Sequence, residues 1–293
     1  MMRTPTNKPP LVLGVDRGTT STDCVLFDGK KILKTASIES AKLQTTPALE
    51  KFIKKNFPTN RVSAVAITGG KARTEKIPDL PILRVHEFDA ITQGASFLSA
   101  GTKNENKFLV ANIGTGTPLL FVENGKWAHL GGTGVGGGTI AGLGKLLLGA
   151  TPRQIEELAL SGTNALDLTV GNAVGGKIGI VPANATASNY GALALGDIRR
   201  NRIRKEDAAW SLLNLVAEVV ARMCVLSARQ LRCERIVVTG RVAENPLVKK
   251  RLQAVGKMFG LKIVVPKTAG SCTAVGAAIC LFKREAGQYF CRL

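Results

Sequence analysis

The chain contains two copies of one pattern, a short apolar strand that leads through a turn of Gly, Thr and Ser into a second strand. The first copy runs from Leu11 to Phe27 around the turn DRGTTST, and the second begins at Lys107 around the turn NIGTGT. Each copy continues through an Asp-Gly or Asn-Gly turn signal into a third strand. Repetition after about a hundred residues predicts a duplicated lobe, and two similar lobes imply a cleft between them.

Hydrophobic periodicity extends this prediction to the rest of the chain. Residues 1–106 predict the order strand, strand, strand, helix, strand, strand, helix, and residues 107–293 predict a second meander followed by helices, two further strands and a last helix. We therefore expect an α/β protein with an N-terminal lobe over 1–106 and a C-terminal lobe over 107–293. A long helix is predicted from Ala208 to Leu231, and its charged residues argue against a membrane span.

The charge balance is basic, with 40 Lys and Arg against 21 Asp and Glu and a formal net charge of +19. Such a chain attracts polyanions. Its densest basic run is Arg199, Arg200, Arg202, Arg204 and Lys205, and no aromatic residue is interleaved to stack on bases. We interpret the run as a solvated loop beside a helix, and expect anionic small ligands rather than specific nucleic acid.

The six cysteines show no C-x-x-C spacing, so the sequence predicts neither a zinc ribbon nor a thioredoxin motif. Reduced thiols in a cytoplasmic protein fit this pattern. The N-terminal MMRTPTNKPP has no apolar run of the kind found in a signal peptide.

The first turn has a composition suited to phosphate. Gly18 lets the backbone approach an anion, the hydroxyl groups of Thr19, Thr20 and Ser21 can donate to phosphate oxygens, and Asp16 can hold Mg²⁺. A polar hairpin loop with no ligand is the alternative for this turn alone. The second turn repeats the arrangement, and two such hairpins at one cleft would clamp a triphosphate, which favours the phosphate interpretation.

A third Gly-rich segment, GGTGVGGGT at 131–139, contains a G-x-G-x-x-G match. No βαβ unit with a suitably placed acidic residue follows it, so a dinucleotide-binding Rossmann fold is excluded. A flexible loop that ends at a helix N-terminus remains, and such a loop suits a phosphate or an adenosine.

Glu87 is the candidate general base. It follows the predicted strand Ile82 to Val85 and precedes a helix, where a carboxylate could orient or deprotonate an acceptor hydroxyl. A helix-capping acid is the alternative role, and Asp89 suits that role better. His86 and His129 are the two histidines of the chain, too few and too separated to predict a metal site.

Taken together, these segments resemble the type II pantothenate kinases, which belong to the superfamily of sugar kinases, the heat-shock chaperone ATPase and actin. The likeness covers nearly the whole chain. It rests on the order and spacing of GVDRGTT, HEFDAITQG, ANIGTGT, GGTGVGGGTIAGLGKLL, DLTVG, TASNYG and VVTGRVAENPL, followed by AVGAA.

The resemblance implies two actin-like, ribonuclease H-like lobes around a nucleotide cleft, a homodimer, ATP and Mg²⁺ as cofactors, and pantothenate as the acceptor, with coenzyme A or acyl-CoA as a further ligand. It implies Glu87 as the base and Asp16 as the metal ligand. The nucleotide contacts that it implies are Asp16, Arg17, Gly18, Thr19, Thr20, Ser21, Gly114, Thr115, Gly116, Gly137, Gly138, Thr139, Ile140, Arg153, Gly240 and Arg241. The implied substrate contacts are His129, Gly132, Thr133, Asn189 and Tyr190.

Two positions depart from the family pattern. Asp23 stands where the family usually has lysine, and His129 where it usually has arginine, while Arg17 replaces a small residue and could restore one positive charge. The leading hypothesis is ATP-dependent phosphorylation of pantothenate, the first step of coenzyme A biosynthesis. The alternatives are a kinase for another small acceptor, a dehydratase activator, and a nucleotide-binding protein with impaired catalysis.

Overall fold

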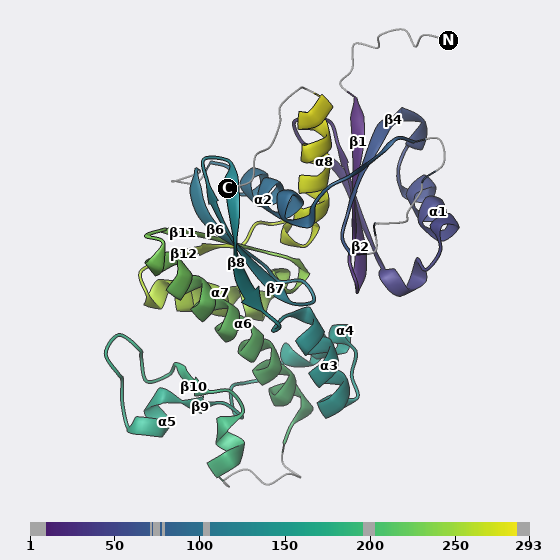
Figure 1. Ribbon diagram of the computed structural model, residues 1–293. Coiled ribbons are helices and arrows are strands. Elements are labelled where there is room, and N and C mark those ends of the chain that lie inside the picture. Colours follow the sequence, from purple (N-terminus) through teal and green to yellow (C-terminus); the bar gives the residue numbers. More distant parts are fainter. Residues whose placement is uncertain are drawn as a thin grey trace, which may run out of the picture. The chain divides into compact units, whose positions relative to one another are not determined.

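The computed structural model describes residues 10–70, 72, 77, 80–101, 106–195 and 203–285, the last without its side chain. They form an α/β protein with two five-stranded sheets and a two-stranded ribbon (Figure 1). The chain divides into two compact units. Unit 1 comprises Met1–Asn106, Val122–Ala128 and Lys267–Leu293, and unit 2 comprises Lys107–Phe121 and His129–Pro266.

The sheet of unit 1 has the order β3-β2-β1-β4-β5. Its strands are β1 (Leu11–Arg17), β2 (Ser21–Phe27), β3 (Ile32–Glu39), β4 (Val62–Thr68) and β5 (Ile82–Arg84). The first three pair antiparallel, as the meander predicted, and β4 pairs parallel with both β1 and β5. The carboxyl ends of β1 and β4 therefore meet at one edge of the sheet.

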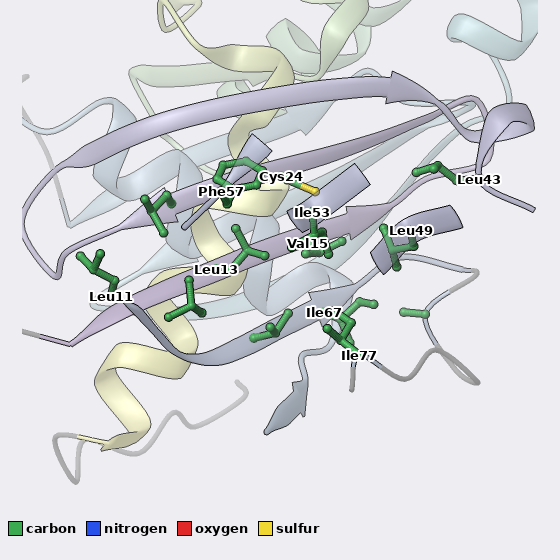
Figure 2. Close-up of a cluster of buried hydrophobic side chains, with 14 residues drawn as sticks. Leu11, Leu13, Val15, Cys24, Leu43, Leu49, Ile53, Phe57, Ile67 and Ile77 are labelled. Carbon is green, nitrogen blue, oxygen red and sulfur yellow. The ribbon is translucent and has the colours of Figure 1, made fainter. Parts of the chain in front are cut away.

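Alternate residues of β1 pack on opposite faces of this sheet. Leu11, Leu13 and Val15 join a cluster with α1 (Thr46–Asn56), which Figure 2 shows around Leu49 and Ile53. On the other face lie α2 (Glu87–Leu98) and α8 (Cys272–Glu285), which run side by side (Figure 1). The last helix thus belongs to unit 1. The lobe boundary expected from the sequence, after residue 106, had placed this helix in the C-terminal lobe, and that boundary stays a prediction.

The sheet of unit 2 has the order β12-β11-β6-β7-β8. Its strands are β6 (Lys107–Asn112), β7 (Thr117–Glu123), β8 (Lys126–Thr133), β11 (Arg235–Thr239) and β12 (Lys262–Val264). Asn124 and Gly125 join β7 to β8 with φ of 50° and 78°. Two central residues with positive φ define the type I′ hairpin turn, so the Asn-Gly signal is confirmed.

The helices of unit 2 include one that is unusually long. They are α3 (Gly137–Leu148), α4 (Pro152–Ala159), α5 (Val170–Val174), α6 (Lys205–Gln230) and α7 (Pro246–Met258). By length and composition α6 could cross a membrane, but 67% of its most apolar stretch is buried inside the protein. Its apolar character is therefore that of a core helix.

Short elements complete the described chain. A ribbon of β9 (Leu168–Thr169) and β10 (Thr186–Ser188) flanks α5, and the sequence did not predict it because strands so short carry no periodicity. In the basic run, Arg204 pairs with Glu206 at 3.5 Å (Nε to Oε2), and Lys205 begins α6. Arg199, Arg200 and Arg202 lie outside the described residues.

Candidate functional site

Unit 2 brings its two Gly-rich segments together. The N–H groups of Gly137 and Gly138, at the start of α3, donate to the carbonyl oxygens of Gly114 and Thr115 at 2.7 and 2.8 Å. A Cβ atom on Gly136 would lie 2.8 Å from the oxygen of Thr115, so a side chain there would force the segments apart. The glycines therefore serve close packing of one loop against the other.

A third segment joins this pair at the end of β11. The Ile113 N–H donates to the Thr239 carbonyl at 2.8 Å, and Thr239 Oγ1 donates to Asn112 Oδ1 at 3.0 Å. Gly240 follows with φ of +90°, and a Cβ atom there would lie 2.4 Å from the Ile113 oxygen. Three segments distant in the sequence thus meet at the ends of β6 and β11.

Arg241 begins the short 3₁₀ helix after Gly240 and approaches α4. Burial raises the pKa of Glu156 on α4, and the positive charge of Arg241 lowers it. Arg153, the second residue of α4, is exposed and pairs with Glu157 at 2.9 Å between Nε and Oε1. Both arginines are exposed, and positive charge of this kind attracts an anionic ligand.

The predicted nucleotide contacts in these loops differ in how far they are exposed to solvent. Gly114 and Thr115 are exposed at the turn, while Gly116 is half-buried and a Cβ atom there would lie 3.1 Å from the Thr133 oxygen. Thr139 Oγ1 accepts from the Gly136 N–H at 3.1 Å, so it caps α3. The Ile140 side chain is buried, so only its backbone is available to a ligand.

The predicted substrate contacts fall in two places of unit 2. His129 is exposed on β8, and Gly132 and Thr133 end that strand. Thr133 Oγ1 accepts from the Val135 N–H at 3.1 Å, and a Cβ atom on Gly132 would lie 2.4 Å from the Thr117 oxygen. Gly132 and Thr133 therefore brace the loop against β7.

Asn189 and Tyr190 instead belong to a polar network centred on Asp167. Asp167 Oδ2 accepts from Nδ2 of Asn189 at 3.2 Å and from Nδ2 of Asn214 at 2.6 Å, and Oδ1 accepts from the Tyr190 N–H at 3.0 Å. The Tyr190 hydroxyl donates to the Ala208 carbonyl at 2.6 Å. This network holds the segment after β10 against α6, and the sequence did not assign Asp167 a role although its motif was noted.

In unit 1, the first turn is held by a residue that the sequence did not identify. Ser40 donates its N–H to the Thr20 carbonyl at 2.9 Å and its Oγ to the Gly18 carbonyl at 2.7 Å. Thr19 and Thr20 are exposed, while Asp16 and Ser21 are half-buried. No local signal marks Ser40, because its contact depends on how β3 returns beside β2.

Arg17 lies on the opposite face of the sheet from Asp16. Its guanidinium is buried and donates from Nη1 to Thr22 Oγ1 at 2.7 Å and from Nη2 to the Leu43 carbonyl at 2.8 Å. These contacts give the guanidinium a structural role. Its positive charge therefore does not lie on the face of Asp16, where it could replace the lysine that the family usually has at position 23. Any nucleotide contact of Arg17 would come from its backbone.

Glu87 is exposed as the first residue of α2. The helix is capped by its neighbour, because His86 Nδ1 accepts from the Phe88 N–H at 3.3 Å. Asp89 lies in the same first turn, where an acidic side chain suits the helix dipole. Its Oδ1 accepts from Trp127 Nε1 at 2.6 Å, and Trp127 stacks on His86 with ring centroids 5.8 Å apart. The Glu87 carboxylate is thus left at the surface beside an ordered aromatic cluster.

Solved structures similar to this chain define its class. An activator of the 2-hydroxyisocaproyl-CoA dehydratase from Clostridium difficile aligns with a TM-score of 0.64 and 16% identity, covering 94% of this chain and 96% of that one. A ROK family glucokinase from Streptomyces griseus aligns with a TM-score of 0.59 and 16% identity, covering 92% and 98%. The fold is that of the actin-like ATPases and sugar kinases, as predicted.

Sequence comparison identifies the family within this class. The Fumble family model matches residues 22–277. A type II pantothenate kinase of Bacillus cereus is 32% identical over 239 residues, covering 80% of this chain and 84% of its own. One from Staphylococcus aureus is 30% identical over 223 residues, covering 74% and 82%. The chain belongs to the Fumble family of type II pantothenate kinases.

Proposed function

We propose that this chain transfers the γ-phosphoryl group of ATP to the primary hydroxyl of pantothenate, giving 4'-phosphopantothenate in the first step of coenzyme A biosynthesis. Family membership over most of the chain carries the proposal. The packed loops around Gly114, Gly137 and Gly240 support it, because phosphoryl transfer depends on a backbone that positions phosphates rather than on covalent catalysis.

In the reaction, the pantothenate hydroxyl oxygen forms a bond to the γ-phosphorus. The bond from that phosphorus to the β–γ bridging oxygen breaks, and ADP leaves with its electron pair. Glu87 takes the hydroxyl proton, a role that suits an exposed carboxylate held at the start of a capped helix. The loops of unit 2 bind the nucleotide, and Arg241 and Arg153 add positive charge near α4.

Asp16 is the proposed Mg²⁺ ligand. It is half-buried at the end of β1, and its register partner Thr68 has a buried hydroxyl that makes no hydrogen bond among the described residues. Carboxylate and hydroxyl oxygens are the donors that Mg²⁺ prefers, so the residues present fit this ion. Bound there, Mg²⁺ would neutralise phosphate charge.

We further propose a homodimer in the cytoplasm, with coenzyme A or its acyl esters as regulatory ligands. The five described cysteines are buried and form no disulfide with one another, in keeping with a reducing compartment. Their burial also disfavours the dehydratase-activator alternative, since a cluster shared between subunits needs cysteines at the surface.

A product assay tests the function. The purified chain is incubated with MgATP and either pantothenate, pantetheine or glucose, and ADP and the phosphorylated acceptor are both measured. We expect equal amounts of ADP and phosphopantothenate with pantothenate. Turnover with glucose alone would support the kinase class and overturn the acceptor, and nucleotide binding without any phosphorylated product would favour the impaired binding protein.

A further inference from the structure

A row of buried polar side chains leads to the first turn of unit 1. Nη1 of Arg17 donates to Thr22 Oγ1 at 2.7 Å, and Thr22 Oγ1 lies 3.0 Å from Ser40 Oγ. Ser40 Oγ donates in turn to the Gly18 carbonyl at 2.7 Å. The residues Arg17, Thr22 and Ser40 are 3%, 0% and 1% exposed, so water does not compete for these hydrogen bonds.

The two ends of this row fix the direction of every hydrogen bond in it. A guanidinium only donates, and a carbonyl only accepts. Because Ser40 has one hydroxyl proton and gives it to Gly18, the proton between Thr22 and Ser40 comes from Thr22. The side chains of Arg17, Thr22 and Ser40 therefore form a hydrogen-bond relay that runs from a positive charge to the Gly18 carbonyl. Each bond of such a chain polarises the next.

Both ends of the hydrogen-bond relay are also tied to the backbone around it. Arg17 Nη2 donates to the Leu43 carbonyl at 2.8 Å, and the Leu43 side chain belongs to the buried cluster of Figure 2. Ser40 donates its N–H to the Thr20 carbonyl at 2.9 Å. The segment after β3 thus holds the turn at two carbonyls, those of Gly18 and Thr20.

The hydrogen-bond relay sets the orientation of one peptide group in the turn. The described residues contain no cis peptide bond, and in a trans peptide the C=O and the N–H point in opposite directions. Because the Gly18 carbonyl is turned toward Ser40, the Thr19 N–H points away from it. Thr19 is exposed, and its N–H makes no hydrogen bond among the described residues. An outward backbone N–H of this kind can donate to an anion.

We infer that Arg17, Thr22 and Ser40 are positioning residues for the nucleotide. The hydrogen-bond relay holds the peptide between Gly18 and Thr19 so that the Thr19 N–H donates to a phosphate oxygen of ATP. This inference rests on the proposed function, which places phosphates at the turn. A donor that is fixed before the ligand arrives loses little conformational freedom on binding, so the relay increases affinity without touching the ligand.

Isothermal titration calorimetry of the full chain with AMPPNP and Mg²⁺ tests the relay, because this ATP analogue binds without being turned over. Thr22→Val keeps the shape of the side chain and removes the hydroxyl, so Kd should rise by about 5-fold or more, the effect of one net hydrogen bond. Thr22→Ser loses a methyl group and keeps the hydroxyl, so Kd should stay within about two-fold of the wild-type value. A role in packing alone predicts the reverse order.

Ser40→Ala should weaken AMPPNP binding as much as Thr22→Val does. Its matched control is Ser63→Ala, because the Ser63 hydroxyl donates at 3.1 Å to the Leu11 carbonyl at the opposite end of β1. Both alanine variants lose a hydrogen bond to a backbone carbonyl, and thermal melting without nucleotide measures the stability that each one loses. Ser63→Ala should change Kd by less than about two-fold.

Kinetics separates this role from a general loss of structure. In Thr22→Val, KM for ATP should rise while KM for pantothenate is unchanged. If Thr22→Val does not fold, the comparison of Ser40→Ala with Ser63→Ala decides. Equal Kd values in the wild type and the relay variants would overturn the inference and leave phosphoryl transfer untouched. A wild type that binds AMPPNP but does not phosphorylate pantothenate would overturn the acceptor, and the Kd comparison would still stand.

Discussion

Arg17 and Tyr190, both predicted to contact ligands, have their side chains engaged within the protein. Arg17 is hydrogen-bonded to Thr22 and Leu43. Burial raises the pKa of the Tyr190 phenol, and the nearby Asp167 raises it further, so the hydroxyl keeps its proton and donates to Ala208. Glu87 differs from both, since its exposed carboxylate remains available to an acceptor hydroxyl.

Replacing Glu87 by Gln tests its role as base. The amide keeps the size of the side chain but cannot take a proton, so kcat with pantothenate should fall by about 100-fold or more, while KM for ATP changes little. Steady-state kinetics measures both constants. Glu50→Gln, on α1 of the same unit, is the control and should retain wild-type kcat. An unchanged kcat in Glu87→Gln would remove Glu87 from the chemistry.

Between elements, the packing of α2 against α8 depends on two glycines. A Cβ atom on Gly276 of α8 would lie 1.7 Å from the Ala90 oxygen, and one on Gly94 of α2 would lie 2.0 Å from the Cys272 oxygen. Neither separation is possible between non-bonded atoms, so the two backbones touch where a side chain would stand. These glycines hold α8 in unit 1.

Gly276→Ala should therefore destabilise the chain by about 2 kcal/mol or more, because the helices must separate to admit the methyl group. Gly142→Ala is the matched control, since Gly142 is in the exposed interior of α3 with no atom within 4 Å of a Cβ atom. It should stabilise by about 0.5–1 kcal/mol. Urea unfolding measures both, and equal effects of the same sign would contradict this account of the helix contact.

At the scale of the whole molecule, burial of thiols in both units links stability to pH. Burial raises the pKa of Cys224 and of Cys280 to about 12, from an ordinary value of 9.0, and raises that of Cys24 as well. Below pH 9 the folded and unfolded states both carry thiols. Above pH 9 the thiols ionise in the unfolded chain before they ionise in the folded protein. The free energy of unfolding therefore decreases as the pH rises toward the folded-state pKa.

We expect the free energy of unfolding to decrease above about pH 9, by on the order of 1.4 kcal/mol per pH unit for each buried thiol at most. Urea midpoints at several pH values measure the slope. Cys224→Ala should give a shallower decrease than the wild type, because one ionising group has been removed from the unfolded state. Identical slopes in the two proteins would show that other groups cause the dependence.

The sequence alone was sufficient to predict those elements whose structure depends on residues close together along the chain. Short apolar runs predicted both meanders, together with an Asp-Gly turn in the first and an Asn-Gly turn in the second. The order and spacing of the sequence motifs placed the chain in its family. Turn chemistry and strand periodicity are local properties, so they can be read without the fold. The candidate loops at Gly114 and Gly137 were predicted for the same reason.

Only the tertiary structure decided which distant residues meet. It placed α8 on the sheet of unit 1, used Ser40 to hold the first turn, turned the Arg17 guanidinium into the core, and aligned Thr68 with Asp16 and Asp23. These contacts join residues tens of positions apart, and they depend on sheet order and register. Sheet order and register are set by packing of the whole unit, which no local pattern of this sequence specifies.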